Sequence, residues 1–193
     1  MTPERSGIFI AIVFIVGGLM FATGCSHYIT KDITSRMIID DIYKDYKVIP
    51  KDLSADSKCG YPPSVNIVNK ESRAEDIVFS KSGVHSFYVK PRDIINSSVS
   101  YLKNGYGKSG IHADDNSTKY IEMKLSGMEL LPGMWQVGSK VRIEVNVPEA
   151  KLSKVYEASE YGQIVFSTFA DSIHLITRQI IDDPAIQNYI LCR

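Results

Sequence analysis

The sequence has no excess of either charge, because 22 Lys and Arg residues balance 22 Asp and Glu residues. A nucleic-acid-binding protein normally carries a basic excess, so this balance argues against that class. Metal ligands and nucleophiles are also scarce, with three Cys and four His in 193 residues. A charged fraction of 23% with 10% aromatics argues against disorder, and 44% hydrophobic residues are enough for one domain.

Long hydrophobic runs are missing as well. The longest apolar run, residues 8–22, has 15 residues, whereas a membrane-spanning helix usually needs about 20. A short start that carries Glu4 and Arg5 precedes it, and this combination is typical of a secretory signal peptide. We therefore expect residues 1–24 to be an export signal that is removed from the mature chain.

The end of this run, Ala22-Thr23-Gly24-Cys25, resembles the bacterial lipobox, although the lipobox usually begins with Leu. The resemblance implies that Cys25 becomes the first mature residue and carries three acyl chains, more than the two signals that stable anchoring needs. Ser26 follows, and in enterobacterial lipoproteins a residue other than Asp at this place implies sorting to the outer membrane. The alternatives are an ordinary signal peptide with a chance cysteine and an uncleaved anchor.

Two cysteines, Cys59 and Cys192, remain once Cys25 carries lipid. In an oxidising periplasm this parity favours a disulfide, and the alternative is a pair of free thiols. Closing so long a loop contributes about 4–5 kcal/mol in the chain-entropy model. A catalytic cysteine is not indicated, because the sequence has no Cys-x-x-Cys pair and no cysteine with a clear histidine partner.

The mature chain divides into a tether, residues 25–63, and one domain, residues 64–193. Partial helical spacing makes the tether either a short helix packed on the domain or a chain that provides reach from the membrane surface. In the domain, period-two alternation predicts strands and apolar residues at helical spacing predict helices. The expected strands are residues 64–69, 84–89, 119–125, 141–147 and 154–161, and the expected helices are residues 91–104 and 163–182, with Asp183 capping a final turn.

The order of these elements is β-β-α-β-β-β-α. The last three strands, separated by turns at Pro132-Gly133 and Pro148, predict an antiparallel meander with one apolar face. Asn104-Gly105 predicts the end of the first helix. We therefore expect an α+β fold in which two helices pack on one face of an antiparallel sheet of about five strands.

From Ser64 to Ile190 the chain resembles the YajG-type family of bacterial envelope lipoproteins. The shared features are a lipobox, a first strand followed by a charged loop at residues 69–76, a helix ending in Gly105-Tyr106, a meander and the acidic helix end Ile181-Asp182-Asp183. The resemblance implies an outer-membrane lipoprotein without a firmly assigned activity. The segment between Cys25 and Ser64 is an addition to the family pattern.

No catalytic or cofactor motif is recognisable. The sequence contains no dinucleotide or Walker loop, no Gly-x-Ser-x-Gly and no His-Glu-x-x-His. Residues 105–110 resemble a phosphate loop only in composition, because they follow a helix, and the acidic turn at residues 114–116 lacks the spacing of a calcium loop. Metal-ligand spacing is absent among the four histidines, His27, His85, His112 and His174. We expect no enzyme activity, no metal and no cofactor.

The best candidate for a contact surface is residues 128–137, where Leu131, Met134 and Trp135 flank a Pro-Gly turn. If exposed, these side chains contact protein or lipid; if the tether covers them, they belong to the core. We expect a lipid-anchored periplasmic scaffold that binds an envelope protein through this loop or through a sheet edge. The alternative is an accessory protein of lipid or lipopolysaccharide transport that binds an apolar ligand.

Overall fold

The computed structural model describes residues 38–42, 53, 57–59, 62–82 and 85–193. The expected signal peptide, the lipidation site Cys25 and most of the expected tether lie outside these residues. The described part has the α+β fold that the sequence predicts. Its elements are β1 (Ser64–Asn69), β2 (Ile77–Ser82), β3 (His85–Val89), α3 (Pro91–Lys108), β4 (His112–Ala113), β5 (Tyr120–Leu131), β6 (Val137–Val147), the 3-10 turn η2 (Pro148–Ala150), β7 (Leu152–Gly162), α4 (Val165–Asp182) and α5 (Pro184–Leu191).

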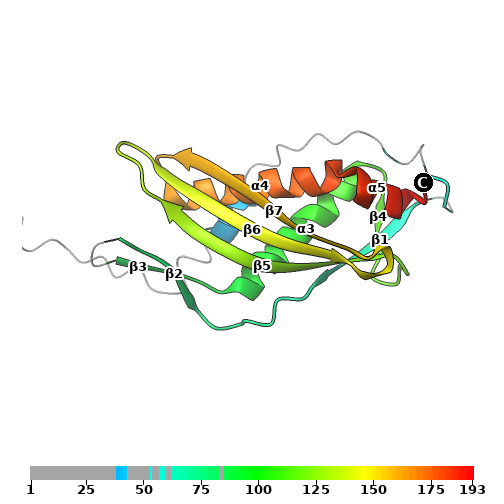
Figure 1. Ribbon diagram of the computed structural model, residues 1–193, viewed down its shortest axis with the longest axis horizontal. Coiled ribbons are helices and arrows are strands. Elements are labelled where there is room, and N and C mark those ends of the chain that lie inside the picture. Colours follow the sequence, from blue (N-terminus) through cyan, green and yellow to red (C-terminus); the bar gives the residue numbers. More distant parts are fainter. Residues whose placement is uncertain (1–37, 43–52, 54–56, 60–61, 83–84) are drawn as a thin grey trace, which may run out of the picture.

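A five-stranded sheet in the order β4-β1-β5-β6-β7 forms one layer of the domain (Figure 1). Strands β5, β6 and β7 make the predicted antiparallel meander. Strand β1, however, runs parallel to both β4 and β5, so the sheet is mixed and the expectation of a purely antiparallel sheet is wrong. Parallel pairing needs a long crossover connection, and residues 70–119 provide it with a hairpin and α3.

Strands β2 and β3 form a hairpin of their own and do not join the main sheet. The alternation pattern did not predict β2, because the register shifts between Val78 and Ser80 and breaks the period of two. The Phe79 ring meets the Phe169 ring of α4 edge-on, with 5.1 Å between the ring centroids. The hairpin therefore packs against α4, and β2 also contacts β5.

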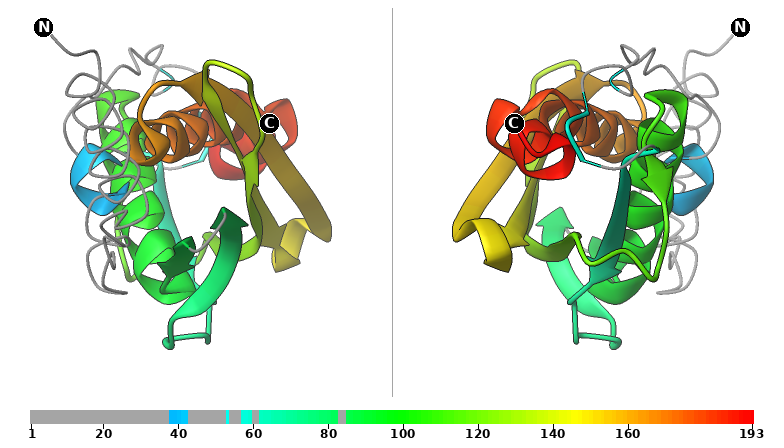
Figure 2. Two further views of the ribbon diagram at one scale, coloured as in Figure 1. Left: turned by 90° about the vertical axis from the view of Figure 1, so that its left-hand side faces the viewer. Right: turned by 90° about the vertical axis from the view of Figure 1, so that its right-hand side faces the viewer.

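Helices α3 and α4 pack against the sheet and against each other, so the core lies between one helical layer and one sheet face (Figure 2). The expectation that Asn104-Gly105 ends α3 is wrong, because the helix continues to Lys108. Tyr106 is fully buried, and the Gly105 carbonyl accepts hydrogen bonds from the backbone amide and hydroxyl of Ser109, at 3.1 and 3.0 Å. This packing outweighs a glycine's cost of about 1 kcal/mol within a helix.

Residues 38–42, within the segment expected as a tether, are helical, and two of them contribute to the core. The side chains of Ile38 and Ile42 are fully buried. The hydroxyl of Ser167, in the first turn of α4, donates a 2.8 Å hydrogen bond to the Asp41 carboxylate. The Ile42 carbonyl lies 2.9 Å from Nε2 of His174. This part of the chain is thus attached along the first half of α4.

Candidate functional site

The long strands of the meander connect two ends of the domain that differ in chemistry (Figure 1). Strand β5 has 12 residues, which corresponds to a length of about 40 Å. It begins at Tyr120, beside α5 and the C-terminus, and we call this the disulfide end. It finishes at Leu131, before the turn into β6, and we call this the tip end.

The apolar tip consists of Leu131, Met134 and Trp135, with Tyr161 from the end of β7 and Ile164 from the connection between β7 and α4. Met134 and Trp135 are each 90% exposed, Ile164 is 61% exposed and Tyr161 is 56% exposed, whereas Leu131 is half-buried. These exposed fractions favour the contact-surface alternative over the core alternative for the tip. The same segment also sends Met128 into the core, where 7% of it is exposed.

Two glycines shape this end. Gly138 of β6 lies opposite Tyr161 of β7, and a Cβ on Gly138 would lie 2.6 Å from the tyrosine ring. The tyrosine ring therefore packs directly on the backbone of Gly138, at the end of β7 that borders the tip. In the turn, a Cβ on Gly133 would lie 2.1 Å from the backbone carbonyl oxygen of Gln136. The turn before Trp135 is thus too tight for any other residue without a shift of the backbone.

The disulfide end is held by a covalent bond and a lysine. Cys59 and Cys192 are bonded to each other, as their parity predicts, with 5.4 Å between their Cα atoms. Nζ of Lys119 lies 2.7 and 2.6 Å from the two sulfur atoms. It also donates to the carbonyls of Tyr189 and Ile190 at 2.6 and 3.0 Å. These carbonyls belong to the last turn of α5, where a positive charge is favourable. Burial lowers the pKa of Lys119.

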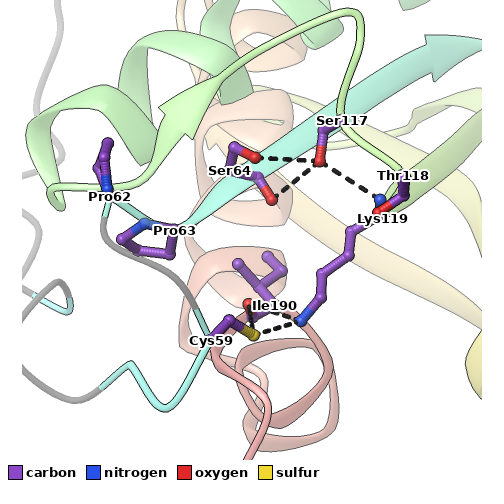
Figure 3. Close-up of a pocket in the computed structure, with 8 residues that line it drawn as sticks. All are labelled: Cys59, Pro62, Pro63, Ser64, Ser117, Thr118, Lys119 and Ile190. Carbon is purple, nitrogen blue, oxygen red and sulfur yellow. Dashed lines mark hydrogen bonds between the residues drawn. The ribbon is translucent and has the colours of Figure 1, made fainter.

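A polar pocket of about 320 Å³ lies beside this lysine (Figure 3). Its lining residues are Cys59, Pro62, Pro63, Ser64, Ser117, Thr118, Lys119 and Ile190. The hydroxyls of Ser64 and Ser117 are 3.2 Å apart, and the Ser117 hydroxyl also donates to the Ser64 carbonyl at 3.1 Å. The main donors of the pocket wall are thus already paired within the protein. This lining is polar, whereas a carrier of lipid needs an apolar one.

An ion pair between a buried glutamate and a partly exposed arginine lies beside the middle of β5. The Glu71 side chain has no exposed surface and accepts from Nε and Nη2 of Arg73 at 2.8 and 2.6 Å. Nη2 of Arg73 also donates to the Leu125 carbonyl at 2.6 Å, next to the register shift between Leu125 and Gly127. The hydrogen bonds from Arg73 lower the pKa of Glu71 to about 2. The pair fastens the loop after β1 to the point where β5 bulges.

Asp183 organises a second polar group, at the start of α5. One carboxylate oxygen accepts from Lys154 Nζ at 2.6 Å and from the Tyr156 hydroxyl at 2.7 Å, and the other accepts from the Ala185 amide at 2.8 Å. Burial raises the pKa of Asp183, but these hydrogen bonds outweigh it and lower the pKa overall. Burial, followed by the hydrogen bond to Asp183, raises the pKa of Tyr156. The group caps α5.

The histidines of the described residues do not assemble a site. His174 is buried and stacks on Tyr101, with 4.5 Å between the ring centroids. Among the residues that the structure describes, no group of three His, Cys, Asp or Glu side chains could hold a metal ion. Within that same part of the chain, no helix is long and apolar enough to cross a membrane.

Sequence reasoning named the cysteine pair and three residues of the tip, but it did not find Ile164 or Lys119. Ile164 joins the tip only because Val137 pairs with Gly162, which places the start of α4 beside the β5–β6 turn. Lys119 looks like an ordinary lysine before a strand, and its role depends on the position of α5.

No family model matches the chain, and no curated protein sequence matches it either. The YajG-type resemblance therefore stays a prediction.

Proposed function

We propose that this chain is a lipid-anchored, non-catalytic binding or scaffold module on the periplasmic face of the bacterial outer membrane, serving an envelope protein complex. The signal-peptide and lipobox patterns that end at Cys25 support the location. The exposure of Met134 and Trp135 at the apolar tip and the outermost position of β7 in the sheet together support the binding role. Large apolar side chains that protrude together commonly mark an interaction surface.

The outer face of the sheet contrasts with the tip, because ion pairs cover it. Lys140 and Arg142 of β6 pair with Glu157 of β7 at 2.8 and 3.8 Å, and Arg142 also pairs with Glu129 of β5. Such a charged, partly exposed face is typical of a protein surface in contact with solvent. The most exposed large apolar side chains of the meander region, Met134 and Trp135, therefore lie at one end of it.

The edge of β7 is a second surface on which a protein could dock. Strand β7 is 11 residues long, and among the strands that the structure describes it pairs only with β6. A free edge can accept an added strand from a partner. Gln179 of α4 covers one point of this edge, because its side-chain amide donates to the Glu157 carbonyl at 3.3 Å. The rest of β7 supports the strand-addition alternative.

The titratable groups with shifted pKa values support a non-catalytic role. Glu71, Lys119 and Asp183 each have backbone and side-chain partners. The core also favours a scaffold over a carrier of apolar ligands. Tyr101, Tyr106 and Phe169 are at most 1% exposed and fill the space between helices and sheet.

Photo-cross-linking in intact cells tests this proposal. A photoreactive amino acid replaces Trp135 at the tip, Val155 on β7 or, as a control, the exposed Lys124 on β5. We expect one stoichiometric envelope protein to be captured from position 135 or 155 and not from position 124. Capture of no protein from either position would overturn the scaffold role. In parallel, a Cys25→Ser variant that still fractionates with the outer membrane would overturn the lipid anchor.

A further inference from the structure

The tip has the chemistry of a segment that enters a membrane surface. Ten consecutive residues, from Leu130 to Ser139, carry no charged side chain. Two large apolar side chains of this segment, Met134 and Trp135, are each 90% exposed. Moving such a segment among lipid headgroups desolvates no ionised group, which is the main cost of membrane entry. Tryptophan favours this interface because its ring is apolar while its N–H finds a polar partner.

Neighbouring side chains widen this surface. The pairing of Gly138 with Tyr161 and of Val137 with Gly162 places the end of β7 beside the tip. Tyr161 and Ile164 are both more than half exposed there. Tyrosine shares the interfacial preference of tryptophan. Apolar side chains from the β5–β6 turn and from the segment where β7 ends and α4 begins thus project from the same end of the domain.

The N-terminal segment reaches the domain at this same end. Asp41 is hydrogen-bonded to Ser167, three residues beyond Ile164 in the first turn of α4. Ile38 follows Cys25 by 13 residues, and a chain of this length spans at most about 45 Å. The acyl chains at Cys25 would therefore keep the first half of α4, and with it the tip, within reach of the bilayer.

We propose that the apolar tip docks on the lipid bilayer that carries the Cys25 acyl chains. This inference rests on the proposed lipid anchor and names the occupant of the tip. A tethered tip meets the bilayer at a high effective concentration, so a weak contact is enough. The two attachments hold the domain upright, with the disulfide end directed into the periplasm. The β7 edge then remains for the protein partner of the complex.

The single tryptophan provides the test, because Trp135 fluorescence reports on the tip alone. The full mature lipidated chain is reconstituted into vesicles of phosphatidylethanolamine and phosphatidylglycerol, with and without brominated acyl chains. We expect the emission to shift to the blue on reconstitution and the brominated lipid to quench it. A Met134→Glu variant should lose both effects, because it adds a charge at an exposed position without touching the core.

A matched control moves the reporter to the other end. In the variant Trp135→Phe/Ser153→Trp, the tryptophan lies at the exposed start of β7, paired with Asn146 near the disulfide end. We expect neither shift nor quenching there. Equal quenching at both positions would overturn the upright orientation.

Three outcomes separate the tip from the anchor. A vesicle-bound chain whose Trp135 is neither shifted nor quenched would overturn the tip proposal and leave the anchor intact. If a protein is captured from position 135 in cells and lipid quenching is absent, the tip belongs to a protein instead. The mass of the N-terminal peptide tests the anchor separately, because a peptide without acyl chains on Cys25 would contradict the proposed function itself.

Discussion

The two ends of β5 are built in opposite ways. At the disulfide end, a covalent bond joins Cys59 to Cys192, and Lys119 pairs with the last carbonyls of α5. At the tip end, Met134 and Trp135 extend into solvent. The domain thus concentrates its fastening at one end and offers an apolar surface at the other. A protein built this way can change its contact surface without changing its stability.

Breaking the disulfide end should have the largest effect on stability. The bond joins residues 133 positions apart, so in the chain-entropy model the variant Cys59→Ser/Cys192→Ser loses about 5 kcal/mol of unfolding free energy. Equilibrium unfolding in denaturant measures this loss against the oxidised protein. If the two proteins unfold at the same denaturant concentration, the disulfide end does not carry the stability assigned to it here.

Acid should weaken the attachment of the loop after β1 to β5, with the second largest effect on stability. Arg73 lowers the pKa of Glu71 from 4.5 to about 2, so the folded state binds this proton more weakly than the unfolded chain. The stabilisation is therefore present above pH 4.5 and is lost as the pH falls towards 2, by on the order of 3 kcal/mol. Unfolding of the protein and of its Glu71→Gln variant is measured across this range. Parallel pH curves would contradict this role of Glu71.

Crowding the tip end should have an intermediate effect. In a Gly138→Ala variant the new Cβ meets the Tyr161 ring and Leu131, so we expect a loss of about 1–3 kcal/mol. Gly107→Ala is the matched control, because nothing lies within 4 Å of a Cβ there and alanine favours the helix by about 1 kcal/mol. Thermal unfolding should move the two variants in opposite directions. A stabilised Gly138→Ala variant would show that Tyr161 does not lie across this glycine.

Removing the exposed side chains should have the smallest effect on stability. Met134→Ser/Trp135→Ser changes side chains that are each 90% exposed, so the unfolding free energy should stay within about 0.5 kcal/mol of the original. The same variant should lose the contact of the tip with its occupant, measured by flotation or cross-linking of the lipidated chain. A large loss of stability would mean that the tip belongs to the core.

Local sequence patterns predicted the helices and strands that bury one face. They did not predict how the connecting segments run between these elements. Strands β5, β6 and β7 alternate and α3 and α4 have helical spacing because each packs one side on the core. The direction of β1 depends on the course of residues 70–119, which no local pattern records. The bulge between Val78 and Ser80 also concealed β2, because it interrupts the alternation.

The candidate site was predictable to a similar extent. Cysteine parity predicted the disulfide, and a tryptophan beside a Pro-Gly turn indicated a contact loop. Whether that loop was covered could not be read from the sequence, because it depended on where the segment before β1 packs. Residues 38–42 pack on α4 and leave Trp135 exposed. Tyr161 joins the loop through the register of β6 with β7, which is a property of the folded sheet.

The bond between Cys59 and Cys192 also has a consequence for proteolysis. Nearly the whole domain lies between these two residues, including the β5–β6 turn and the connection from β7 to α4. A protease that cuts the backbone once in either loop therefore produces two fragments that remain one molecule. Nicked domains would stay attached to the segment that precedes Cys59, and only reduction followed by unfolding would separate the pieces.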